Sequence, residues 1–93
     1  MSTRKIKVIF KTQNGKTYTQ EVDTNKTVDR MLADFLENIK AIEKMNEYSF
    51  MVRTLPLTKD GVINKKVKYV KQIKPDCIIQ VRHVGTLSGA LFS

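Results

Sequence analysis

Residues 11–28 read KTQNGKTYTQEVDTNKTV, and this stretch decides the fold. It contains Asn14-Gly15, a pair that tolerates the positive φ angles of a tight hairpin turn. Residues 16–22 then alternate between polar and apolar side chains, which is typical of a strand with one buried face. The stretch therefore predicts the turn and second strand of a β-hairpin, followed by a polar link to the next element.

The residues before this turn complete the hairpin. Residues 5–13 alternate in the same way, so that an extended strand carries Ile6, Val8 and Phe10 on one side. Its other side carries Lys7, Ile9 and Lys11. We therefore expect a half-buried first strand at the amino-terminal end of the chain.

The residues after residue 22 predict a helix. Thr27 is a good N-cap, and Asp29 in the first turn would favour the positive end of the helix dipole. One apolar stripe with spacings of three and four is formed by Val28, Met31, Leu32, Phe35, Ile39 and Ile42. The pattern predicts a helix that runs from residue 28 to the mid-forties.

The second half of the chain predicts two further strands. Residues 48–54 read as a strand that faces inward with Phe50 and Val52 and ends before Pro56. Asp60-Gly61 marks a turn. Residues 77–84 form a last strand, whose continuous apolar start favours a central position in the sheet.

Residues 62–74 fit two structures. Val67 and Tyr69 alternate as in a strand, whereas Val67, Val70 and Ile73 have the spacing of a short helical turn. We favour a short strand with an irregular or helical connection. The order of elements then predicts a compact two-layer α+β domain over residues 1–84, with residues 85–93 as a flexible tail.

Part of the chain resembles ubiquitin. The matching residues, in register without a gap, are Lys11-Thr12, Gly15-Lys16-Thr17, Thr19, Glu21-Val22, Thr27 and Val28. Looser matches follow at Leu57, Asp60-Gly61, Ile73, Ile79 and Val81, so that the likeness covers roughly residues 6–84. The resemblance implies a ubiquitin-like β-grasp fold, with a mixed sheet of four to five strands packed on one main helix. It also implies a non-catalytic protein that acts as a protein-protein interaction module or as a protein modifier.

The resemblance indicates a binding face on the exposed side of the sheet. We expect it to be formed by Ile9, Lys11, Met51, Arg53, Gln80 and Arg82. Gln13 stands where ubiquitin has a leucine, so this face is mixed and basic rather than apolar. We therefore expect weak or no binding to ordinary ubiquitin receptors, because solvated charge replaces a desolvated apolar hot spot.

The carboxyl-terminal residues bear on the modifier role. Conjugated members of the family end in Gly-Gly, or in a single glycine in the ubiquitin-fold modifier. This chain has single glycines at Gly85 and Gly89, and each would need proteolytic removal of the residues after it. The alternative is that both are ordinary glycines in a loose tail.

A lysine-rich run supports a different function. Residues 64–74 contain Lys65, Lys66, Lys68, Tyr69, Lys71 and Lys74. Such a run can follow a phosphate backbone while the tyrosine stacks on a base, which makes a small basic nucleic-acid-binding domain the alternative function. It is also compatible with a solvated connection beside the sheet.

Composition and charge narrow the kinds of partner and of site that the chain can have. The net charge of +8 favours acidic partner surfaces. Cys77 is the single cysteine and His83 the single histidine, so the chain makes no internal disulfide and cannot assemble a four-ligand Cys/His metal site. We expect a monomer in the reducing cytoplasm or nucleus, with no cofactor, no membrane association and no catalytic activity.

Overall fold

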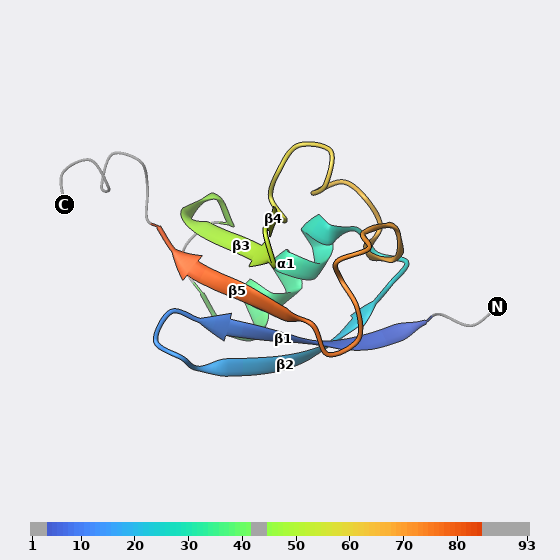
Figure 1. Ribbon diagram of the computed structural model, residues 1–93. Coiled ribbons are helices and arrows are strands. Elements are labelled where there is room, and N and C mark those ends of the chain that lie inside the picture. Colours follow the sequence, from blue (N-terminus) through green and yellow to red (C-terminus); the bar gives the residue numbers. More distant parts are fainter. Residues whose placement is uncertain (1–3, 42–44, 85–93) are drawn as a thin grey trace.

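The computed structural model describes residues 4–41 and 45–84 (Figure 1). The described strands are β1 (Lys5–Thr12), β2 (Thr17–Asp23), β3 (Tyr48–Val52), β4 (Leu55–Pro56) and β5 (Ile78–His83). The α-helix α1 covers Val28–Asn38, and two short 3₁₀ helices cover Met45–Glu47 and Val67–Tyr69.

The strands form one mixed five-stranded sheet in the order β2-β1-β5-β3-β4. β1 and β5 run parallel, and all other neighbours run antiparallel. β5 therefore lies in the centre of the sheet, as its apolar start predicts. The helix α1 crosses one face of the sheet (Figure 1), which confirms the expected two-layer α+β arrangement.

The predicted hairpin is present, and its turn is built around glycine. The Gly15 N–H donates to the Thr12 carbonyl at 3.0 Å, and the Thr12 N–H donates to the Lys16 carbonyl at 2.8 Å. Gly15 takes a φ of +88°, a conformation that a residue with a Cβ rarely adopts. Asn14 keeps a negative φ, so the loop is a three-residue turn with a glycine bulge rather than a two-residue Asn-Gly turn.

The helix begins where the sequence predicts and ends earlier. The Thr27 hydroxyl accepts a hydrogen bond from the Arg30 N–H at 3.2 Å. At the other end Lys40 takes a φ of +56°, its N–H donates to the Glu37 carbonyl, and the Ala41 N–H donates to the Leu36 carbonyl. These two bonds close the helix in a Schellman motif. The prediction of a helix into the mid-forties was therefore wrong, and Ile42 lies outside the described residues.

Phenylalanines hold the helix on the sheet. The Phe10 and Phe35 rings are stacked with their centroids 4.0 Å apart, and Phe50 meets both edge-on at 6.4 and 6.2 Å. All three side chains are fully buried. Because β1, α1 and β3 each supply one ring, this cluster joins the two layers of the domain.

The third strand is shorter than predicted. β3 ends at Val52 instead of residue 54, because Arg53 takes a φ of +56° and starts a two-residue turn to Leu55. Residues 55–56 then pair with β3 as an edge strand. Pro56 is tolerated there because an edge residue has no second neighbour to which it must donate.

Residues 62–74, for which the sequence fits two structures, adopt the helical one. Val67–Tyr69 is a 3₁₀ helix, and Val67, Val70 and Ile73 are all buried. The favoured short strand was wrong, since within this region the described pairing is a single bridge between Lys66 and Thr27. The predicted turn at residues 60–61 is confirmed by the φ of +85° at Gly61.

Candidate functional site

The outer face of the sheet, the face turned away from α1, carries the predicted binding residues. Lys11, Gln80 and Met51 are register partners in one row across β1, β5 and β3. Arg82 lies farther along β5 opposite Ser49, and Ile9 lies one row back on β1. Arg53 is exposed in the turn after β3. The structure therefore brings five of the six residues onto three adjacent strands and places the sixth directly after one of them.

One further residue of this face, Ile78, was not among the predicted binding residues. It pairs in parallel register with Ile9, and 49% of its surface is exposed. Its place in the apolar start of the last strand favoured burial, but within the described chain no helix covers the outer face. The signal was present in the alternation of the strand, because Ile78 has the same parity as Gln80 and Arg82.

The outer face carries several exposed basic side chains. Lys7, Lys11, Arg53 and Arg82 are exposed, and none of them forms an ion pair with any residue of the described ranges. An ion pair of 3.8 Å joins Lys5 to Glu21 at the β2 side. Lys7 and Lys11 flank Ile9 along β1, and Glu21 on β2 is the register partner of Lys7. Ile78 is exposed, whereas its partner Ile9 is half-buried. Such a surface combines an apolar contact with attraction for an acidic partner.

His83 and Gln13 lie at one end of the sheet. The Gln13 Oε1 atom accepts a hydrogen bond from the His83 N–H at 3.0 Å. The His83 ring lies 5.0 Å from the Tyr48 ring, and its Nε2 atom is 3.9 Å from a Glu47 carboxylate oxygen. Gln13 thus has a structural role at the position where ubiquitin has its leucine.

Cys77 is half-buried and packs against the core. Burial raises the pKa of its thiol, because the thiolate would lose hydration there. In the part of the chain that the structure describes, no group of three His, Cys, Asp or Glu side chains is placed to hold a metal ion. No described helix is both long enough and apolar enough to cross a bilayer. The expected absence of a cofactor and of catalysis stays a prediction.

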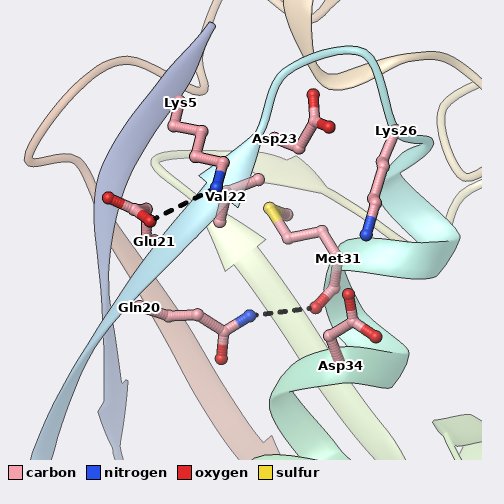
Figure 2. A pocket seen from close by; sticks show the side chains of 8 residues that line it. All are labelled: Lys5, Gln20, Glu21, Val22, Asp23, Lys26, Met31 and Asp34. Carbon is pink, nitrogen blue, oxygen red and sulfur yellow. Dashed lines mark hydrogen bonds and ion pairs between the residues drawn. The ribbon is translucent and has the colours of Figure 1, made fainter. Parts of the chain in front are cut away.

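Figure 2 shows a pocket of about 220 Å³ between β2 and α1. The Gln20 Nε2 atom donates to the Met31 carbonyl at 3.4 Å, while its buried Oε1 atom has no hydrogen-bond partner among the described residues. The charged side chains that line the pocket are Lys5, Glu21, Asp23, Lys26 and Asp34. Because these charges have both signs, the lining favours neither an anionic nor a cationic ligand.

The predicted lysine run lies outside the strands that form the outer face. Its members Lys65, Lys66, Lys68, Lys71 and Lys74 are exposed, as is Tyr69. They belong to the long connection between β4 and β5 that passes beside the start of α1 (Figure 1). The two candidate conjugation residues, Gly85 and Gly89, lie outside the described residues.

Comparisons with known proteins identify the fold. No family model and no curated protein sequence matches the chain. The solution structure of a ubiquitin-like domain from an Arabidopsis thaliana protein is similar, with a TM-score of 0.71 and 20% identity, over 89% of this chain and 81% of that one. A structure described as a molecular mimic of SUMO in DNA repair has a TM-score of 0.70 and 11% identity, over 87% of this chain and 94% of that one. The chain therefore has the ubiquitin-like β-grasp fold.

Proposed function

We propose that this ubiquitin-like domain is a non-catalytic protein-interaction module that binds a partner through the outer face of its sheet. One observation carries the proposal: Ile78, 49% exposed, pairs with Ile9 on a face that also carries the exposed cations Lys7 and Lys11. The fold supports a role in recognition, and the residues of this face supply its chemistry.

The partner that fits this face is an acidic protein segment with apolar side chains. Covering the pair of isoleucines removes apolar surface from water, which contributes affinity at about 25 cal/mol per Å² before the cost of association. Lys11, Arg53 and Arg82 would meet carboxylates at the rim. Rim charges act mainly on the association rate and on the choice of partner.

Affinity capture from source cells with quantitative mass spectrometry tests the proposal. The wild-type domain is compared with Ile78→Ser on the outer face and with Ala33→Ser, which changes an exposed residue of α1. We expect a set of partners that the wild type and Ala33→Ser retain equally and that Ile78→Ser retains about 10-fold less, the effect of losing a moderate hot-spot residue. A partner set equally retained by all three proteins would reject the outer face as the binding site.

A covalent form of the same role is attachment of the domain to other proteins through Gly85 or Gly89 after the following residues are removed. This proposal is supported by the sequence, because glycine lets the backbone pass through a narrow channel that a Cβ would obstruct. Intact mass of the protein from its source tests it. Trimming after either glycine together with higher-mass adducts supports attachment, and a mass that matches all 93 residues with nothing attached rejects it.

A further inference from the structure

Three separate segments meet at the end of the molecule where β1 begins (Figure 1). The Thr24 N–H donates to the Arg4 carbonyl at 2.9 Å, and the Lys68 N–H donates to the Thr24 carbonyl at 3.0 Å. The Val67 N–H donates to the Lys26 carbonyl at 2.8 Å. The start of β1, the link before α1 and the lysine run are therefore fixed side by side, although they are far apart in the sequence.

This junction concentrates positive charge. Its basic side chains, all exposed, are Arg4, Lys26, Lys65, Lys66 and Lys68. Residues 24–28 and 61–75 contain no acidic residue, although an aspartate borders each range at both ends. None of these five cations forms an ion pair with any residue in the described ranges. We call these five residues, together with Tyr69, the basic pole.

The side chains of the basic pole, not the neighbouring helix end, are available to an anion. A helix N-terminus attracts anions through its free N–H groups. Here the Val28 N–H donates to the Lys65 carbonyl and the Asp29 N–H donates to the Ile63 carbonyl. With these amides occupied, binding at the pole depends on the mobile ammonium and guanidinium groups, which suit a flexible polyanion more than a single small anion.

Tyr69 adds a flat apolar surface to the pole. It is 64% exposed, and the Lys68 Nζ atom lies 5.3 Å from the centre of its ring. A protein interface or a bilayer would need several apolar side chains at its centre. Base stacking needs one ring, and lysines beside it can neutralise the adjacent phosphates.

We propose that the basic pole binds single-stranded nucleic acid, with Tyr69 stacking on a base and the surrounding cations contacting phosphates. This activity is separate from the proposed protein contact on the outer face. Binding of this kind has little sequence preference and weakens steeply with salt, because it is driven by the release of counterions.

Fluorescence anisotropy with a labelled oligo(dT) of roughly 20 nucleotides tests the proposal over a range of salt concentrations. The triple variant Lys65→Glu, Lys66→Glu, Lys68→Glu is compared with Lys7→Glu, Lys11→Glu, Lys16→Glu, which makes the same change of net charge elsewhere. We expect the first variant to lower the slope of log K against log salt by about 2, since each phosphate contact on a single strand contributes about 0.7. Tyr69→Ala is expected to weaken binding about 10-fold without changing the slope, and Tyr69→Phe to bind as wild type.

Three outcomes would overturn the inference. Equal losses in the two triple variants would show attraction to net charge alone. Unchanged affinity in Tyr69→Ala would remove the stacking contact. Stronger binding to vesicles of acidic phospholipid or to polyglutamate than to the oligonucleotide would assign the pole to another class of partner. Circular dichroism of each variant separates loss of binding from loss of fold.

Discussion

The side chain of Gln13 accepts a hydrogen bond from the backbone N–H of His83 at 3.0 Å, so the first hairpin turn is joined to the end of the last described strand. β1 and β5 are already register partners up to Thr12 and Val81. The glutamine side chain extends this pairing by one contact beyond the ladder. The position that supplies an apolar leucine in ubiquitin thus serves here to hold two sheet segments together.

Replacing Gln13 by Ala is expected to loosen this end of the sheet only locally. One exposed hydrogen bond contributes about 0.5 kcal/mol, so global stability changes little. Hydrogen exchange of the His83 amide is expected to become faster, while exchange at Ile79 stays unchanged. Gln72→Ala, at an exposed glutamine in the loop before β5, is the matched control. Equal exchange of His83 in both variants would contradict the structural role of Gln13.

Phe35→Ala is expected to destabilise the domain by about 3–5 kcal/mol, because it removes the ring that stacks on Phe10 and leaves a cavity between helix and sheet. Phe35→Leu keeps much of the volume and is expected to lose about 1.5 kcal/mol. Urea denaturation measures both, with the leucine variant informative even if the alanine variant does not fold. Similar small losses in the two variants would show that the stack contributes little.

Lys40→Gly is expected to stabilise the domain by about 0.5–1 kcal/mol, since glycine takes a left-handed conformation without the penalty of a Cβ. Lys40→Ala removes the same charge but keeps the Cβ, so its stability is expected to stay near that of the wild type. Thermal or urea unfolding compares the two. A gain shared by both variants would assign the effect to charge instead of backbone conformation.

Cys77 is expected to be alkylated by iodoacetamide with a pH midpoint above that of the unfolded chain, because burial raises the pKa of its thiol. The unfolded chain then releases its thiol proton at a lower pH than the folded protein. The contribution of this group to stability is therefore complete below the ordinary thiol pKa and decreases as pH rises through the raised value. Comparing the alkaline unfolding of wild type and Cys77→Ala measures this contribution, which the variant should lack. Alkylation midpoints that coincide in the folded and unfolded states would show that burial does not protect the thiol.

Local signals were sufficient to predict most of the fold. Gly15 at the turn, Thr27 before the apolar stripe and the alternation of β1 each depend on a few neighbouring residues, and the structure confirms them. The end of α1 had no such signal, because Ile39 continues the apolar period and residues 39–55 contain no glycine or proline. Lys40 takes the helix-ending conformation although the sequence favours continuation.

The candidate sites were predictable only where they too depend on local patterns in the sequence. Alternation along the strands placed Lys11, Gln80 and Arg82 on the outer face. The same alternation places Ile78 on this face, but its exposure also depends on whether another element covers the face, which the strand's own sequence does not specify. The meeting of Arg4 and Lys26 with the lysine run depends on hydrogen bonds between distant segments, so no local pattern could reveal the basic pole.

The parallel pairing of β1 with β5 has a consequence for synthesis of the protein. The partner of Ile9 and Phe10 in the middle of the sheet is translated only after α1, β3 and β4 have been made. Until the ribosome has released β5, β1 lacks one neighbour, and β3 lacks the strand that joins it to the amino-terminal hairpin. The nascent chain is therefore expected to gain its native structure late and cooperatively, and fragments that stop before residue 78 are expected to be unfolded and prone to aggregation.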